Sequence, residues 1–292
     1  MRGMVLAAGF GTRLQPLSHV RPKALLPCFS FPLIELVLHH LRPAVNGSIL
    51  INLHHGALQL ERFLRDYDDI TLLPESVILG TGGGIANACR NCPGEELLVH
   101  NVDIISDIDL VEVATAYQEN PSYALLLLHY HPDFLQVFTD GDRITGFGHG
   151  GALAYTGIMI LSPQASQELA ATGQFNIIDF FQDAIARRRD IRGLTLHPGC
   201  WIDAGRAAHY LRFHRRYFAD DEFRLLINRI LPGPPNTTGN SFTGSEVEVD
   251  DNCELSDSVI WDRVRIRRGP IREAVLADGV TVAQPVYQAM VI

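Results

Sequence analysis

Apolar and polar positions follow two different periods along the first two-thirds of the chain. Short apolar runs predict strands over residues 3–8, 48–53, 96–100, 123–130 and 152–161. Apolar residues at three- and four-residue intervals predict helices over residues 32–42, 57–67, 84–92, 108–119, 176–189 and 207–218. Between them, a hairpin over residues 134–144 turns at Asp140-Gly141. Strands that alternate with helices in this way are typical of an α/β fold with a mostly parallel sheet and right-handed crossovers.

A change of texture divides the chain near residue 231. Residues 231–240 are rich in Pro, Gly and Asn, and they predict a connector between a main domain, residues 1–230, and an extension, residues 241–292. In the extension, Val and Ile recur at intervals of roughly six residues, as in Val259 to Val264 and Val275 to Val280. This spacing predicts a few turns of β-helix, which are too short to be stable alone. We expect the extension to pack on the main domain or on a second copy in a homo-oligomer.

Composition narrows the classes of partner. The 292 residues are 47% hydrophobic and 20% charged, with a formal net charge of −9. An acidic protein is not expected to bind nucleic acid or an anionic membrane non-specifically. No segment approaches the roughly 18 apolar residues that would cross a bilayer, and we expect a cytoplasmic protein. Any phosphate-rich ligand must therefore meet a local cluster of positive charge.

The cysteines allow one alternative site. The chain has five cysteines, an odd number that indicates no disulfide framework. Cys89 and Cys92 form a C-x-x-C pair, and His197 and Cys200 have a similar spacing, so the two pairs would make a zinc site if they met in space. Small buried cysteines are common, and Cys89 falls on a predicted amphipathic helix. We therefore expect no metal at these residues.

The most specific motif follows the first strand. Residues 6–17 read LAAGFGTRLQPL, and residues 21–27 read RPKALLP. Gly9 and Gly11 allow a tight turn and a close approach of phosphate to backbone N–H groups. Arg13 adds a planar fork of donors and Lys23 a compact charge. A dinucleotide-binding G-x-G-x-x-G is excluded because Leu14 holds its third position, and the spacing of a P-loop is absent.

These two segments resemble the sugar-1-phosphate nucleotidyltransferases, the sugar-nucleotide pyrophosphorylases of the NTP-transferase type. The family signature is G-x-G-T-R followed by P-K-x-L-x-P, which residues 9–13 and 22–27 match in order and spacing. The resemblance covers about residues 1–225 and implies a Rossmann-like fold of the nucleotide-diphospho-sugar transferase type, with the extension appended. It also implies roles for individual residues: nucleotide binding for Leu6, Ala8, Gly9, Gly11 and Thr12, and catalytic phosphate contacts for Arg13 and Lys23.

A second glycine-rich segment, residues 79–85, reads LGTGGGI. Glycines this dense carry a conformational-entropy cost, which favours a functional loop over a plain turn before a helix. The resemblance implies that Gly80, Thr81, Gly82 and Gly83 bind the nucleobase. The triple-glycine form is most similar to the N-acetylmuramate-1-phosphate uridylyltransferase group.

Two aspartates are candidates for a Mg²⁺ site. Asp103 follows a predicted strand, where open α/β sheets bind ligands, and Asp203 lies in the segment WIDAG. Mg²⁺ is typically held by one or two carboxylates together with phosphate oxygens. The resemblance implies this role for both, although Val102 stands where the family usually has Gly. The alternative for either residue is a helix cap or a turn.

The sugar-phosphate site is the least complete. The resemblance places it at Thr156, Gly157 and Asn176, but the family's Lys is missing from residues 146–151, where His149 is the only candidate substitute. The expected reaction joins an NTP, UTP or GTP, to a sugar 1-phosphate with Mg²⁺ as cofactor and releases pyrophosphate. The alternative is a regulatory paralogue that binds a sugar nucleotide without turnover. The sequence decides neither the base nor the sugar.

Overall fold

Two compact units interleave along the chain. The computed structural model describes residues 1–173 and 175–292. The first unit comprises residues 1–9, 40–104 and 108–199, and the second comprises residues 10–39, 105–107 and 200–292.

The first unit is built on a nine-stranded sheet. Its strands, in spatial order, are β5 (Ile70–Pro74), β4 (Ile49–Leu53), β1 (Arg2–Leu6), β6 (Leu97–Asn101), β11 (Ala154–Leu161), β8 (Ala124–His129), β12 (Ile191–Thr195), β10 (Arg143–Phe147) and β9 (Val137–Asp140). Only β11 and β10 run against the others among the strands described in this sheet. The mostly parallel sheet and the hairpin of β9 and β10 confirm the fold class expected from the sequence.

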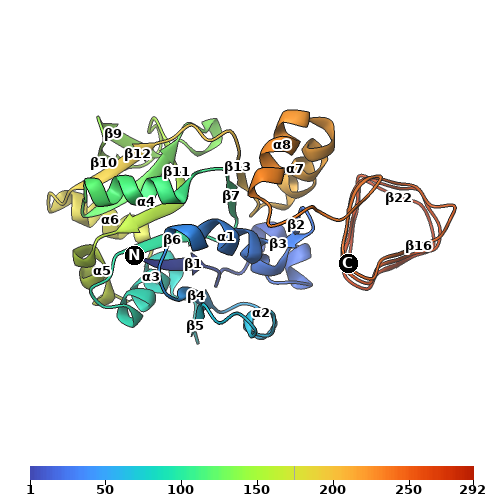
Figure 1. The fold of residues 1–292 in the computed structure, drawn as a ribbon, viewed down its shortest axis with the longest axis horizontal. Helices are drawn as coiled ribbons and strands as arrows, with labels where there is room; N and C mark the ends of the chain where they lie inside the picture. Colours follow the sequence, from blue (N-terminus) through green and yellow to red (C-terminus); the bar gives the residue numbers. More distant parts are fainter. Residues whose placement is uncertain (174) are drawn as a thin grey trace. The chain divides into compact units, whose positions relative to one another are not determined.

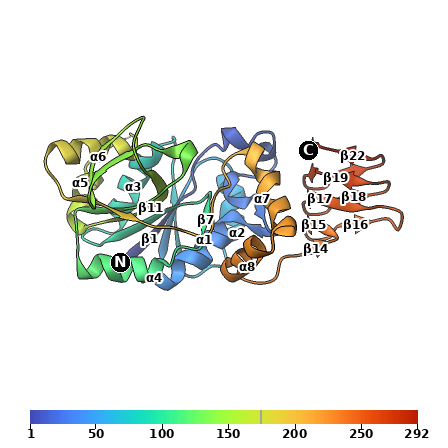
Figure 2. The same ribbon diagram turned by 90° about the horizontal axis from the view of Figure 1, so that it is seen from above.

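Helices cover both faces of this sheet, which is why β4 and most of β8 are buried throughout. Figure 2 shows α3, α5 and α6 on one face and α4 on the other. The helices of the unit are α2 (Ala57–Leu64), α3 (Gly80–Asn91), α4 (Leu110–Glu119), α5 (Pro163–Ala170) and α6 (Ile177–Ala186), and α1 (Leu33–Leu41) crosses between the units. In the described part of the chain, no helix has the length and apolarity needed to cross a bilayer.

The second unit joins the N-terminal loops to two helices near residue 220. Its elements before the extension are η1 (Thr12–Leu14), η2 (Leu17–His19), η3 (Lys23–Leu25), β2 (Pro27–Cys28), β3 (Phe31–Pro32), β7 (Ile104–Ser106), β13 (Trp201–Asp203), α7 (Ala207–Ala219) and α8 (Asp221–Ile230). Buried aromatic rings fill its core, including Phe29, Tyr210, Phe213, Phe242 and Trp261. Apolar surface from sequence-distant segments is thus removed from water in one place.

The extension is a β-helix, as the sequence predicted. Parallel strands stack in register, so that Leu255 pairs with Ile271 and Ile271 with Val286. Its strands are β14 (Thr237–Thr238), β15 (Asn240–Thr243), β16 (Glu248–Val249), β17 (Leu255–Ile260), β18 (Arg265–Ile266), β19 (Ile271–Arg272), β20 (Val275–Leu276), β21 (Thr281–Val282), β22 (Val286–Tyr287) and β23 (Met290–Val291). Figure 1 looks along the coil and shows its three-sided outline. The β-helix packs through β15 and β17 on α7 of the same unit.

Candidate active site

The end of β1 and the end of β6 lie side by side in the first unit. Leu6 pairs with Asn101, and the Val102 N–H donates to the Leu6 carbonyl at 3.2 Å. Ala8 and Gly9 continue from β1, and the buried Asp103 follows one residue after this bond. The side chain of Val102 is itself buried. The carboxyl ends of these parallel strands thus bring Asp103 to the start of the glycine-rich loop.

A third strand, β11, completes this edge. Gly157 has a φ of +90°, and a Cβ there would lie 2.9 Å from Asn101 Nδ2, so only glycine is accommodated without movement. Gly157 therefore lies against the end of β6. The Thr156 side chain is fully buried against β8, where its hydroxyl donates to the Leu127 carbonyl at 2.9 Å.

The second glycine-rich segment lies inside a helix. The expected helix start at residue 84 is wrong, because α3 begins at Gly80 and the glycines form its first turns. A Cβ at Gly82 would lie 2.4 Å from the Phe175 ring, so the glycines allow the helix to pack closely on this side chain. First-turn N–H groups of a helix have no partner within the helix and favour anions or acceptor atoms; here the Gly82 N–H donates to the Phe175 carbonyl.

Two predicted regions meet beside this helix start. The Thr81 hydroxyl accepts from Ile177 N–H at 3.1 Å and donates to Asn176 Oδ1 at 3.4 Å. Asn176 is the N-cap of α6, where its side chain accepts from Ile178 N–H. The structure thus joins a residue expected at the nucleobase to one expected at the sugar phosphate, and it gives Asn176 a capping role.

A buried carboxylate that the sequence reasoning missed connects the two glycine-rich segments. Asn52 Oδ1 accepts from the Ala7 N–H at 2.8 Å, and Asn52 Nδ2 donates to Glu75 Oε1 at 2.7 Å. Glu75 Oε2 accepts from the Leu79 N–H at 3.1 Å. A Cβ at Gly84 would lie 2.6 Å from Asn52 Nδ2, so helix α3 packs closely against this series of hydrogen bonds. The available signal was a polar Asn within the apolar run 49–53.

In the second unit, the remainder of the first loop folds beside Lys23. Gly11 has a φ of +63°, and a Cβ there would lie 3.4 Å from the Cβ of Lys23. The loop then continues into η1, which contains Thr12 and Arg13, both exposed. The N-terminal motif (residues 9–13) and the P-K segment (residues 21–27) are therefore neighbours in the structure, as a shared phosphate site requires.

Asp203 ends β13 in the same unit. Its Oδ1 accepts from Gly205 N–H at 2.8 Å, and its Oδ2 lies 3.4 Å from Arg206 Nε. The alternative role of capping α7 is not observed, because Arg206 occupies the N-cap position without a side-chain cap. Asp203 is held in a fixed turn, with its carboxylate largely buried.

Helix α7 makes hydrogen bonds to the end of the P-K segment and to Phe29. The Tyr210 hydroxyl donates to the Pro27 carbonyl, and His214 Nε2 accepts from the Phe29 N–H at 3.1 Å. His214 Nδ1 donates to the Tyr210 carbonyl at 2.6 Å, which fixes the neutral tautomer. Complete burial lowers the pKa of His214 to about 3, so this imidazole stays uncharged.

The alternative zinc site does not form in the described residues, where no three His, Cys, Asp or Glu side chains are grouped to hold a metal ion. Cys89 and Cys92 are buried in the first unit, while Cys200 belongs to the core of the second. Burial raises the pKa of Cys89 to about 12 and keeps it a neutral thiol.

Comparison with known proteins decides the family. Residues 3–173 match the model of the MobA-like NTP transferase domain. The chain belongs to this family. The enzyme class predicted from the sequence, a sugar-1-phosphate nucleotidyltransferase, is thereby confirmed together with the fold.

Two curated relatives show how far the family likeness extends. The chain is 31% identical over 218 residues to the N-acetylmuramate alpha-1-phosphate uridylyltransferase of Neisseria meningitidis, which covers 70% of this chain and 93% of that protein. It is 24% identical over 304 residues to a probable mannose-1-phosphate guanylyltransferase 2 of Oryza sativa, covering 94% of this chain and 82% of that protein. The second alignment therefore extends into the β-helix.

A solved structure shares the fold. A putative glucose-1-phosphate thymidylyltransferase from Bacillus anthracis superposes with a TM-score of 0.66 at 20% identity, and the match covers 73% of this chain and 93% of that one.

The chemistry of the two aspartates fits the metal that the family implies. Both offer carboxylate oxygens, the hard donors that Mg²⁺ prefers. Both lie at strand ends; Asp203 Oδ1 accepts from the Gly205 N–H, and its Oδ2 lies beside Arg206. Asp103 belongs to the first unit and Asp203 to the second.

Proposed function

We propose that the protein transfers a nucleotidyl group from an NTP, UTP or GTP, to a sugar 1-phosphate in a Mg²⁺-dependent reaction that gives an NDP-sugar and pyrophosphate. The observation that carries the proposal is the Leu6–Val102 bond, which fixes Asp103 beside the glycine-rich loop. Names of relatives support UTP and GTP, since one is a uridylyltransferase and another a guanylyltransferase.

In this proposal the chain's own residues mainly position charge. The turn at Gly11 exposes backbone N–H groups to the triphosphate, and Arg13 and Lys23 stabilise the pyrophosphate that leaves. The attacking sugar-phosphate oxygen is already an anion, so no general base is needed. Asp103 and Asp203 would hold Mg²⁺, which when bound neutralises charge on the α-phosphate. The Thr81–Asn176 contact would hold the nucleobase and sugar sides of the site in register.

The test is a pyrophosphate-release assay of the wild-type protein with each of the four NTPs and a panel of sugar 1-phosphates. We expect turnover with Mg²⁺ for UTP or GTP, and none after chelation with EDTA. Turnover that is undiminished by EDTA would contradict the metal assignment.

The same panel separates the regulatory alternative, which the missing Lys in residues 146–151 favours. Binding of an NDP-sugar by titration calorimetry, with no pyrophosphate released for any pair, would replace the enzymatic proposal with the regulatory one.

A further inference from the structure

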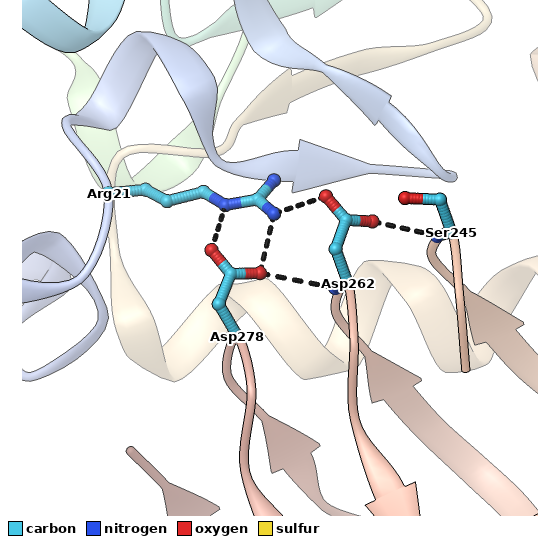
Figure 3. A network of polar contacts seen from close by, with 4 residues as sticks. All are labelled: Arg21, Ser245, Asp262 and Asp278. Carbon is cyan, nitrogen blue, oxygen red and sulfur yellow. Dashed lines mark hydrogen bonds and ion pairs between the residues drawn. The ribbon is translucent and has the colours of Figure 1, made fainter. Parts of the chain in front are cut away.

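Arg21, two residues before Lys23, is bound by the β-helix (Figure 3). Its Nε donates to Asp278 Oδ2 and its Nη2 to Asp278 Oδ1, both at 2.5 Å, in a bidentate pair. Nη2 also donates to Asp262 Oδ2. All three residues belong to the second unit, so one side chain connects the P-K segment to two successive coils of the β-helix.

The two carboxylates are themselves fixed by backbone. Asp262 Oδ1 accepts from Ser245 N–H at 2.7 Å, and Asp278 Oδ1 accepts from Asp262 N–H at 3.1 Å (Figure 3). The Arg21 guanidinium also lies 5.4 Å from the ring centroid of the buried Trp261. Backbone N–H groups thus hold both carboxylates in place to bind the planar guanidinium. The bidentate geometry fixes the orientation of the Arg21 side chain as well as adding binding energy.

Burial distinguishes this cluster from the other ion pairs on the β-helix. The side chains of Arg21, Asp262 and Asp278 are 16%, 26% and 16% exposed. Arg267 and Glu248 are 45% and 51% exposed, and such open pairs contribute little. Burial alone would raise the pKa of Asp262, but the Ser245 N–H and Arg21 outweigh it and lower the pKa, so the carboxylate stays charged.

The other end of the same segment is also held. The Tyr210 hydroxyl on α7 donates to the Pro27 carbonyl, whereas Arg21 holds the start of the segment on the β-helix. Between these ends, η3 carries Lys23, and its turn is closed by the Leu25 N–H donating to the Pro22 carbonyl at 2.8 Å. Residues 22–26 therefore have two fixed ends on different elements.

We propose that Asp262 and Asp278 are positioning residues for Lys23, and that the β-helix is thereby part of the phosphate-binding apparatus. The clamp on Arg21 holds η3, and η3 holds the Lys23 ammonium where the leaving pyrophosphate needs it. This consequence for turnover rests on the proposed function, whereas the clamp itself does not.

The clamp is tested without any substrate. The Asp262→Asn/Asp278→Asn double variant removes both charges, and a Glu248→Gln/Glu254→Gln double variant removes two exposed charges from the same β-helix. Hydrogen exchange measured by mass spectrometry should rise by about tenfold in peptides covering residues 21–26 of the first variant and stay unchanged in the second. Unchanged exchange in the aspartate variant overturns the clamp.

Its effect on turnover is tested by a mutant cycle with Lys23→Met. In the wild-type background, the aspartate double variant should lower kcat/KM by about tenfold, because small displacements of a catalytic group are costly. In the Lys23→Met background, the same two substitutions should lower it less than about twofold, since the group that they position is gone. A melting curve of each variant verifies that the protein is folded.

The outcomes are separable. Additive losses in the cycle, or a wild-type rate in the aspartate variant, overturn the positioning role. Absence of turnover by the wild-type protein for every substrate pair overturns the proposed function instead, and the exchange experiment still decides the clamp.

Discussion

Replacing Glu75 with Gln removes one charge from a buried chain of hydrogen bonds with almost no change of shape. The two oxygens of Glu75 accept from two donors, Asn52 Nδ2 and the Leu79 N–H. A glutamine offers one oxygen and one NH₂, so one of those donors must face another donor. Flipping Asn52 does not relieve the clash, because its Oδ1 is needed by the Ala7 N–H. The substitution should destabilise the protein by about 2 kcal/mol, the contribution of one hydrogen bond to a charged group.

Thermal unfolding measures this effect. A loss of about 2 kcal/mol corresponds to a fall in Tm of about 3 °C for a protein of this size, given an unfolding entropy of about 2.1 cal/mol/K per residue. Glu119→Gln, at an exposed position at the end of α4, is the matched control and should leave Tm within about 1 °C of wild type. On the proposed function, Glu75→Gln should also raise KM for the NTP, because Ala7 and Leu79 belong to the two glycine-rich segments. A Glu75→Gln protein as stable as the control would refute the reasoning about the donor chain.

Three further predictions follow from single residues. Asp203→Asn should reduce pyrophosphate release by about a hundredfold or more while leaving Tm near the wild-type value, and a wild-type rate would remove Asp203 from the metal site. Gly84→Ala should lower the free energy of unfolding by about 1–3 kcal/mol, since its Cβ would lie 2.6 Å from Asn52 Nδ2, whereas Gly233→Ala, with no atom within 4 Å, should be neutral; equal effects on denaturant unfolding would disprove this. The pKa of His214 is about 3 when folded and 6.5 in its ordinary state, so the unfolded chain binds the extra proton in this window and stability falls as pH decreases through it. At pH 5 the loss from this group is about 2 kcal/mol. His214→Gln should therefore flatten the dependence of unfolding free energy on pH between 5 and 6.5, and an unchanged slope would contradict the assignment.

The pattern of apolar residues predicted the elements that are long or strongly periodic. The central strands β1, β4, β6, β8 and β11 and the helices α1, α4 and α7 were expected close to their observed bounds. Two helices were missed. Helix α5 has a weak apolar signal and buries mainly Ala165, Ser166 and Leu169. Helix α8 was missed although Phe223, Leu226, Ile227 and Ile230 have helical spacing. Two five-residue strands were also missed: β5 at one edge of the sheet, and β12 between β8 and β10.

Glycine was the main source of error at the site. Dense glycines indicate a loop by propensity, yet the first turns of α3 contain them because Phe175 and Asn52 leave no room for a Cβ. That constraint is tertiary, so no local pattern shows it. The buried chain through Asn52 and Glu75 is equally non-local, because its members are 23 residues apart in sequence. By contrast, the proximity of Gly11 to Lys23 follows from a short local segment, and the motif spacing anticipated it.

The interleaved order of the two units has a consequence for synthesis of the protein on the ribosome. Arg21 and Asp262 are 241 residues apart, and at about 5–20 residues per second the ribosome needs roughly 12–48 s to make the intervening chain. During that time the nascent segment around Lys23 lacks Asp262 and Trp261, and for most of it α7 is missing as well, so its apolar side chains stay uncovered. The first unit, whose sheet is made by residue 195, has most of its partners much earlier. The segment around Lys23 thus reaches its final form late, after the sheet of the first unit.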